Sequence, residues 1–394
     1  MTRHIPDQRP PCAIVVPAFC CRVRRTQRTS TDAQLRETPS RSDASVRQSS
    51  ARALQRAPRR SIAGLTGLIA MVLGAGCAST PVVQSDEELR ETAVRYIRAG
   101  ARFPENPAVR AQGIEAVSQV LPPQEASVLI REGLRDEHAG VRFAACMALG
   151  EIKNTDARPA IEPLAEDPDA SVRVAAYYAL EQLGGFSYRR QWVDALRRHP
   201  DPSVRRNAAL ALGRLGNTAV LTFLERASME DEDEGVRLQA LEAMAHLGDS
   251  YAVSRFIHDA HGGLGFKQPF ALLTLGHIRG EQVLATLHSR LRHAPYLEAR
   301  LASARGLGMQ GHDDGYELAL ASLKWSSPIQ GLADDLPENQ IMRVRSMAAL
   351  ALGDIGKREA LEPLARLMQS EEDPRVQLAA ATAIVMILDR TSAP

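Results

Sequence analysis

Apolar residues recur three and four positions apart along most of the chain, and this helical pattern itself repeats about every 32 residues from residue 100 onward. A valine holds the same place in most repeats, and Gln268 and Ala299 hold it in the two others. The marker positions are Val109, Val141, Val172, Val204, Val236, Gln268, Ala299, Val344 and Val376, separated by 32, 31, 32, 32, 32, 31, 45 and 32 residues. So constant a period predicts a solenoid in which each unit packs against its neighbours.

Each unit is predicted to contain two helices. The first helix, which carries the marker, opens on an aspartate that is often followed by proline, as at Asp201-Pro202. Aspartate accepts hydrogen bonds from the free amides of a helix start, and proline suits the first turn. The first helix ends on Leu-Gly, as at Leu212-Gly213, where glycine permits a left-handed turn or a close helix crossing. A second, shorter helix follows, as in residues 157–165 and 360–368.

The pattern as a whole predicts an all-α fold, a right-handed α-solenoid of about eight to nine helix-pair repeats over residues 89–390. A helix near residues 88–102 is expected to cap the first end of the array. Residues 376–388 have no second helix after them and are expected to form a truncated cap at the other end. With helix axes about 8–10 Å apart, the units would form an arc on the order of 80 Å.

The recurring pattern D-P-x-V-R-x-x-A-A-x-A-L-G-x-L-G resembles the HEAT-repeat family, in the short bacterial form that is also called PBS-lyase HEAT-like, an armadillo-type solenoid. The resemblance covers roughly residues 103–390. It implies an α-solenoid whose second helices line a concave face. It also implies binding to proteins as the commonest work of the family, although it names no partner.

An arginine follows the marker valine in most units. These residues are Arg110, Arg142, Arg173, Arg205, Arg237 and Arg345. Each lies beside the capping aspartate at the same place in its unit, so we expect a structural ladder of Arg–Asp contacts between neighbouring units. A ligand site would occupy a few units rather than nearly all of them.

Two departures from the repeat are candidate contact sites. In the segment Ser187–Arg198, Arg189, Arg190, Arg197 and Arg198 surround Trp192. This basic, aromatic-bearing face could bind an acidic partner or a lipid head group; the alternative is a solvated face above a tryptophan of the core. The 45-residue step holds an insertion near residues 325–340 that contains Trp325, which is either a contact loop or a tolerated addition.

The histidines form a third departure, because eight of the ten lie between His199 and His312. His261 and His293 follow the marker by 25 residues in consecutive units, and His258 lies one turn before His261. A metal site needs three or four ligands, and few acids lie nearby. Some enzymes built on HEAT repeats bind iron through His-Glu dipeptides, which this sequence lacks. We therefore expect no metal and no cofactor. The alternative is a lyase or enzyme subunit, or a metal-binding protein, that uses these His-rich repeats.

Charge divides the chain in two. Residues 1–77 carry a net charge of +9 and residues 78–394 a net charge of −8. The acidic body would repel a phosphate backbone, which argues against nucleic-acid binding. Of the five cysteines, Cys146 lies in an apolar helical pattern and is expected to be buried, and no disulfide framework or zinc spacing is present.

The head of the chain contains an export pattern. Residues 1–58 are rich in Arg, Ser, Thr and Pro and are predicted to be disordered. Residues 59–76 begin with Arg59-Arg60 and continue as sixteen uncharged residues, which is short for a membrane span of about 20 but suits a signal peptide. A start codon at Val46 or Leu54 would explain the distance from Met1 and leave the preceding residues untranslated.

The end of this pattern, Leu73-Gly-Ala-Gly-Cys77, resembles a bacterial lipoprotein signal. The resemblance implies removal of the signal before Cys77 and lipid on that residue, with residues 77–88 as lipidated N-terminus and spacer. Gly74 departs from the usual leucine of the family, so a plain secretory signal, a short anchor and no export at all remain alternatives.

These patterns together predict an exported, membrane-tethered, non-catalytic scaffold that faces the periplasm or cell surface of a bacterium. We expect protein partners that the sequence does not name, no nucleic acid and no small-molecule substrate. The alternative without export is a cytoplasmic adaptor.

Overall fold

The computed structural model describes residues 85–185, 187–262, 267–330 and 335–392. All of them belong to one compact unit. They form eighteen α-helices and four short 3-10 helices, and no strand occurs in this part of the chain. The all-α solenoid that the repeat predicts is confirmed. The predicted signal peptide and Cys77 lie outside the described residues.

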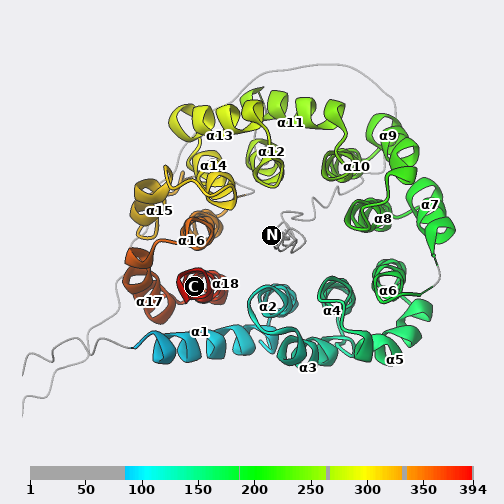
Figure 1. Cartoon of the computed structure of the whole chain (residues 1–394), viewed down its shortest axis with the longest axis horizontal. Helices are drawn as coiled ribbons and strands as arrows, with labels where there is room; N and C mark the ends of the chain where they lie inside the picture. Colours follow the sequence, from blue (N-terminus) through cyan, green and yellow to red (C-terminus); the bar gives the residue numbers. More distant parts are fainter. Residues whose placement is uncertain (1–84, 186, 263–266, 331–334, 393–394) are drawn as a thin grey trace, which may run out of the picture. The chain divides into compact units, whose positions relative to one another are not determined.

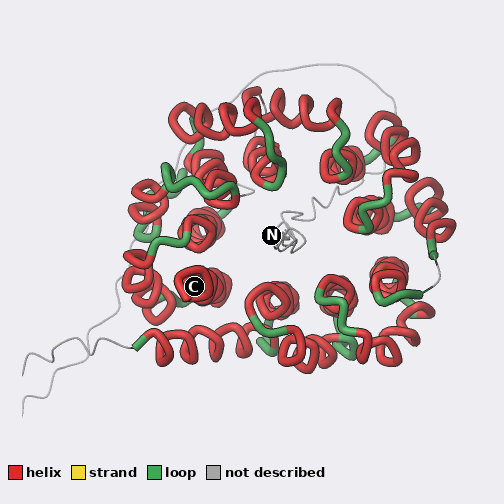
Figure 2. The backbone as a smooth tube through the Cα atoms, viewed as in Figure 1, coloured by secondary structure: helices red, strands yellow, loops and turns green. Residues whose placement is uncertain are grey.

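The helices form nine pairs, each with one outer and one inner helix (Figure 1). The outer helices are α1 (Asp86–Ala101), α3 (Pro123–Gly133), α5 (Arg158–Ile161), α7 (Arg189–Arg198), α9 (Leu221–Glu230), α11 (Ser250–Gly262), α13 (Glu281–His293), α15 (Tyr316–Ser322) and α17 (Leu361–Ser370). The inner helices are α2 (Pro107–Val120), α4 (Ala139–Glu151), α6 (Ala170–Gln182), α8 (Pro202–Arg214), α10 (Glu234–His246), α12 (Lys267–Gly276), α14 (Leu297–Met309), α16 (Pro337–Ile355) and α18 (Pro374–Ser392). Loops join the helices within each described segment (Figure 2), and the connection from Ser322 to Pro337 holds the insertion.

The helix that carries the marker is the inner one, so the expectation that the second helices line the concave face is wrong. The physical reason lies in side-chain size. Inner helices lie on a tighter curve than outer helices and must approach one another more closely, which small residues allow. Ala208, Ala209 and Ala211 of α8 are fully buried. At Gly213, a Cβ atom would lie only 2.7 Å from the Cβ of Ala243 on α10.

Helix ends follow the local chemistry of the repeat. Asp201 accepts a hydrogen bond from the amide of Ser203 at 2.8 Å and precedes Pro202 in the first turn of α8. Gly248 ends α10 in the left-handed region with φ 84°, whereas Gly213 lies inside the last turn of α8. Both roles expected of the Leu-Gly glycine therefore occur, in different units.

The two ends of the array are not caps, because they pack against each other. Helix α18 contacts α1 and α2 in addition to its sequence neighbours α16 and α17 (Figure 1). Arg358 forms an ion pair with Asp86 at 2.7 Å, and Arg90 forms one with Asp389. We call the contact of α1 and α2 with α18, together with the Arg358–Asp86 pair from the turn before α17, the seam. The described helices therefore close into a ring, and the last marker helix is the inner half of a complete ninth pair.

Two boundaries differ from those predicted. Helix α1 begins at Asp86, within the predicted spacer 77–88, because Ser85 and Glu88 form a capping box with hydrogen bonds of 3.2 and 2.9 Å. The last residues of the insertion near residues 325–340 are helical, because α16 already begins at Pro337.

In the part of the chain that the structure describes, no helix combines the length and the apolar character that crossing a membrane requires.

Candidate functional site

The ladder arginines bind the connection that precedes the next inner helix. Arg142 shows the arrangement: its Nε and Nη2 each lie 2.9 Å from a carboxylate oxygen of Asp167, and its Nη1 donates to the carbonyl oxygens of Asp136 and Glu137. The same bidentate contact joins Arg110 to Asp136 and Arg205 to Asp231, and a single hydrogen bond of 2.6 Å joins Arg345 to Glu371.

Arg173 and Arg237 keep the backbone part of this arrangement, because Nη1 of each donates to two carbonyl oxygens just before its own inner helix. An acid lies 25 or 26 residues after each of the other four arginines. In the unit after Arg173, His199 holds that place.

The charges of the ladder are satisfied internally. Burial opposes ionisation of Asp136, but hydrogen bonds from Arg110 and from the amide of His138 outweigh it and hold the pKa of Asp136 below its usual range. The same balance, with Arg142 and the amide of Asp169 as donors, lowers the pKa of Asp167. These ion pairs hold neighbouring units together.

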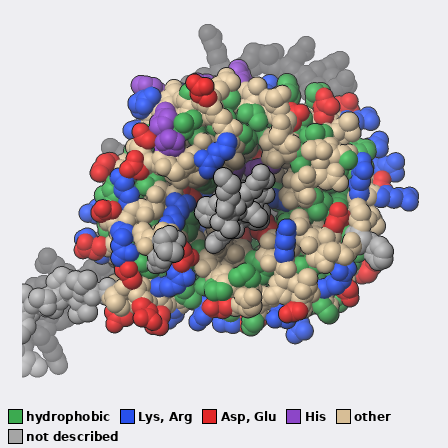
Figure 3. All heavy atoms as spheres, in the orientation of Figure 1, with side chains coloured by type: hydrophobic (Ala, Val, Ile, Leu, Met, Phe, Trp, Pro, Cys, Tyr) green, Lys and Arg blue, Asp and Glu red, His purple; other side chains and the backbone are tan. Residues whose placement is uncertain are grey.

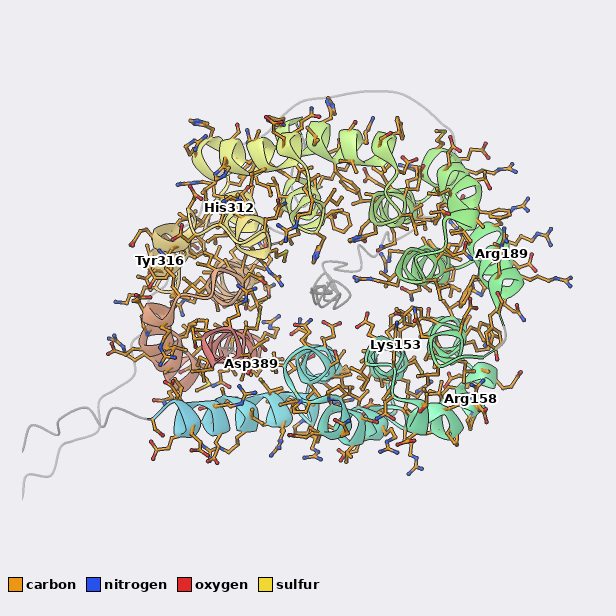
Figure 4. All side chains as sticks on the ribbon, in the orientation of Figure 1. Lys153, Arg158, Arg189, His312, Tyr316 and Asp389 are labelled. Carbon is orange, nitrogen blue, oxygen red and sulfur yellow. The ribbon has the colours of Figure 1, made fainter. Side chains whose placement is uncertain are left out.

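Helix α7 presents a basic outer face. Arg189, Arg190, Arg197 and Arg198 are all exposed, and we call them the α7 face. Lys and Arg side chains project from the rim at this place (Figure 3) and Figure 4 labels Arg189 on its outer side. Asp194 is the one acid in the helix. It lies 3.8 Å from Arg190 and 3.7 Å from Arg198, whose side chains are 93% and 73% exposed.

Trp192 does not belong to this face. Its side chain is 1% exposed, and its indole N–H donates to the carbonyl oxygen of Val174 at 3.3 Å. Since it points into the core between α6 and α8, the prediction of Trp192 as a partner-binding residue is wrong. Trp192 is therefore a core tryptophan, and the four arginines lie exposed on the same helix.

Trp325 lies at the start of the insertion and is half-buried. Its carbonyl oxygen accepts a hydrogen bond from Nε of Arg345 at 3.1 Å. Gln340, which is buried, exchanges two hydrogen bonds of 3.0 Å with the backbone of Ile329. The described part of the insertion is therefore pinned to α16, and it exposes Ile329 and Leu336 to solvent.

The histidines singled out by the repeat do not form a cluster in the described residues. His258, His261 and His293 are exposed, and Nδ1 of His261 lies 2.9 Å from the carbonyl oxygen of Ile257. The structure instead brings together His288, His312 and Asp314. Sequence reasoning missed this group because His288 lies on an outer helix and the other two lie in the next connection, a spacing without a motif.

The inner side of the ring carries ionisable groups that the repeat pattern did not reveal. One small recess is lined by Glu115, Ser118, Gln119, Ala144, Met147, Ala148, Glu151, Leu210 and Arg214, from α2, α4 and α8. Burial, and then the neighbouring Glu151, raise the pKa of Glu115 well above its usual range. Burial also raises the pKa of Glu151 to about 7, against the opposing charge of Arg214.

A histidine pair lies further round the inner side. The rings of His246 and His277 are 5.7 Å apart, and Nε2 of His246 lies 3.7 Å from a carboxylate oxygen of Glu242. Burial, followed by the charges of His246, Arg305 and Arg214, lowers the pKa of His277 to about 3. Its Nε2 has no hydrogen-bond partner among the described residues, so the ring is held neutral.

Comparison with known proteins agrees with the repeat. The family model for HEAT repeats matches residues 127–187, 190–258 and 326–394, just over half of the chain, which confirms the resemblance seen in the sequence. No curated protein sequence matches the chain.

Three solved structures illustrate the range of similar folds. Human deoxyhypusine hydroxylase in complex with glycerol is 18% identical, with 76% of this chain and 96% of that chain covered and a TM-score of 0.34. The CpcE–CpcF complex of phycocyanin lyase from Nostoc sp. is 19% identical, with 71% and 100% covered and a TM-score of 0.37. Kap121p bound to Nup53p is 12% identical, with 77% and 40% covered and a TM-score of 0.32. All three TM-scores lie below 0.5, so these structures support no conclusion about what this chain binds.

Proposed function

The chain belongs to the HEAT-repeat family, and on that premise we propose that it is a non-catalytic scaffold that binds protein partners in a bacterial envelope. The family fold is consistent with protein binding. The observation that carries the proposal is the α7 face, where four exposed arginines accompany a single acid of the helix, Asp194, which pairs with Arg190 and Arg198. The partner is therefore an acidic protein surface.

The α7 face suits such a partner because its charge is not balanced within the helix. Among the described residues, Arg197 has no ion-pair partner, and Arg190 and Arg198 share Asp194 at separations of 3.8 and 3.7 Å. Exposed arginines bind carboxylates in a planar, bidentate manner and cost little to desolvate compared with lysine. Complementary charge of this kind speeds association and selects the partner.

The test is a pull-down from detergent-solubilised membranes with the intact chain and with a triple variant, Arg190→Gln, Arg197→Gln and Arg198→Gln. We expect the variant to lose the partner and the wild-type complex to weaken with salt. The matched control is Arg226→Gln with Arg366→Gln, two exposed arginines of outer helices that each pair with a glutamate four residues away. Equal recovery by both variants would refute the α7 face as the site.

We propose further that the scaffold is tethered to the membrane through lipid on Cys77, as the signal pattern of residues 59–77 suggests. The chain is then exported and faces the periplasm or the cell surface. The measurement is incorporation of radiolabelled palmitate, which Cys77→Ala should abolish. Persistence of the label in that variant, or a wild-type chain recovered only from cytoplasm, would exclude the tether and favour a cytoplasmic adaptor.

A second candidate function, an enzyme or lyase subunit, rests on the inner side of the ring. A carboxyl group with a pKa near neutrality is suited to transfer protons at physiological pH, and Glu151 has a pKa of about 7. Glu115, Glu242 and His246 also lie on inner helices, and His277 directly follows the inner helix α12. A chromophore or small molecule that co-purifies with wild-type protein and is lost in Glu151→Gln would favour this candidate over the scaffold.

A further inference from the structure

Three metal-ligating side chains meet beside the connection between α14 and α15. His288 lies on α13, and His312 and Asp314 lie in that connection. Their potential ligand atoms all lie within 4.8 Å of one another. Nδ1 of His288 is 3.7 Å from Oδ1 of Asp314, and the rings of His288 and His312 are 5.5 Å apart at an interplanar angle of 81°. Figure 4 labels His312 at this place, near Tyr316.

We propose that His288, His312 and Asp314 bind a borderline divalent transition-metal cation, of which Zn²⁺ is the representative. Zinc binds imidazole nitrogen and carboxylate oxygen at about 2.0–2.2 Å, so two ligands of one ion lie roughly 3–3.5 Å apart. The 3.7 Å between His288 and Asp314 is already close to this separation. The widest separation, at most 4.8 Å, must contract by about 1.3–1.8 Å, which rotations of the three side chains supply.

The connection is fixed at both ends, which favours a defined site. The amide of His312 donates to the carbonyl oxygen of Leu307 at 3.0 Å, and the amide of Tyr316 donates to that of Asp313 at 2.9 Å. Lys357 pairs with Asp313 at 2.6 Å and lies 4.8 Å above the ring of Tyr316. Lys357 is thereby paired with Asp313, whereas the carboxylate of Asp314 lies beside His288. Ligands held by their own contacts are the condition for a precise metal site.

The chemistry of the donors selects the class of ion. Two imidazoles and one carboxylate suit zinc, iron, cobalt or nickel, whereas calcium and magnesium prefer oxygen ligands throughout. Three protein ligands leave further positions for water. The side chains of His288 and Asp314 are 23% and 47% exposed, so ions and water can reach the site from solvent.

A bound ion would have a structural consequence. It would link α13 of the seventh pair to the connection that leads to α15 of the eighth. Helix α15 has only seven residues, and the insertion follows it. An ion at this place would therefore stabilise the part of the ring where the repeat is least regular.

The direct test is a titration of the intact chain with Zn²⁺ and, separately, with Co²⁺ followed by absorption spectroscopy. We expect one equivalent to bind, with cobalt bands typical of nitrogen and oxygen ligands and no thiolate charge-transfer band. His288→Ala and His312→Ala should each weaken binding at least ten-fold, as should Asp314→Asn, which changes an exposed side chain without a change in packing. His261→Ala and His293→Ala are the matched controls, because both residues are exposed and lie at helix ends.

Binding that is equal in wild type and in the three site variants would overturn the proposal, as would binding that the two control variants lose. Absence of any binding by correctly folded protein would overturn it as well. A second readout is thermal unfolding: Zn²⁺ should raise the midpoint of the wild-type protein and of the controls and leave that of Asp314→Asn unchanged. Mg²⁺ should shift none of them.

Discussion

The junctions inside the array and the seam that closes it are built differently. Between α8 and α10, the helices pack so closely that a Cβ atom added at Gly213 would lie 2.8 Å from the Cα of Ala243. At the same junction Arg205 and Asp231, whose side chains are both less than 10% exposed, form a bidentate ion pair. At the seam, the pairs Arg90–Asp389 and Arg358–Asp86 are about a third to a half exposed. A Cβ added at Gly100 would meet the flexible end of Leu378 at 3.1 Å.

The internal junctions and the seam are therefore stabilised by different kinds of contact. The four junctions at which Arg110, Arg142, Arg205 and Arg345 pair with an acid of the next unit hold charges largely shielded from water. The seam relies on apolar contacts of α1 with α18 and on ion pairs that water and salt reach. Exposed pairs contribute little to stability, and breaking a buried pair is costly. We therefore expect the seam to open before the junctions that a buried ladder pair joins.

The strongest test of the comparison is to break one internal ion pair. Arg205→Ala leaves Asp231 buried without its partner, and we expect a loss of about 3–5 kcal/mol in the free energy of unfolding. The measurement is urea unfolding followed by circular dichroism. The control is Arg226→Ala, which removes an exposed pair with Glu230 and should cost less than about 1 kcal/mol. Equal losses would show that burial does not distinguish the ladder from surface pairs.

The second test compares two glycines. In Gly213→Ala the new Cβ lies 2.8 Å from the Cα of Ala243, so backbone must move, and we expect a loss of about 1–3 kcal/mol. In Gly100→Ala the new Cβ lies 3.1 Å from the end of Leu378, which can rotate. Alanine also favours the helix by up to about 1 kcal/mol, so this variant should be neutral or more stable. Thermal unfolding of both variants decides; a large loss in Gly100→Ala would mean that the seam is as tight as the interior.

Low pH should weaken the ladder ion pairs between neighbouring units and so lower the free energy of unfolding. The pKa values of Asp136 and Asp167 are lowered in the folded protein, so the unfolded chain takes up protons first as pH falls. The stability that these carboxylates contribute is fully present above the unfolded value of 3.8 and is lost as pH falls through the folded values. Urea unfolding between pH 5 and pH 2 should show this loss, and Asp167→Asn should flatten it. An unchanged slope in that variant would contradict the prediction.

Salt should act on the seam, with the smallest effect. Arg90→Gln and Arg358→Gln each remove an exposed pair worth about 0.5 kcal/mol, so local opening of α1 and α18 should increase about two-fold for each. Hydrogen exchange of the two helices measures this opening, because it reports local as well as global unfolding. The wild-type protein in high salt should resemble the variants, while exchange in α8 and α10 stays unchanged. Faster exchange throughout the ring would mean that the seam does not open on its own.

Much of the fold could be predicted because each unit carries its own local signals. Asp201 caps a helix, Gly248 ends one, and the stripe of alanines in α8 marks a face of close packing, so local chemistry and the 32-residue period specify an all-α solenoid. The role of the ladder arginine also follows from its regular place in the repeat.

Two features could not be predicted in the same way: the closure of the ring, and which helix of each pair lies on the inner side. Ring closure depends on the sum of small rotations between units, and no local pattern records that sum. Arg90 and Asp389 are 299 residues apart, and their segments have the sequence pattern expected of two free ends of the array. The choice of inner helix depends on curvature, which the side-chain pattern of one unit does not reveal.

The candidate sites were predicted less well for related reasons. Trp192 and the four arginines are neighbours in sequence, but successive residues of a helix point in directions about 100° apart, and the tryptophan turns inward. His288 and His312 come from an outer helix and a loop, and only the crossing of α13 and α14 brings them together.

Contact between α18 and α1 also fixes the number of repeats. A solenoid with free ends can gain or lose a unit at either end, and tandem duplication extends it without disturbing the units already present. Here a tenth pair would have to enter between two existing partners, and every junction would need a smaller turn to accommodate it. The count of nine is thus a property of the whole array rather than of any single unit, and drift in repeat number is blocked by the geometry itself.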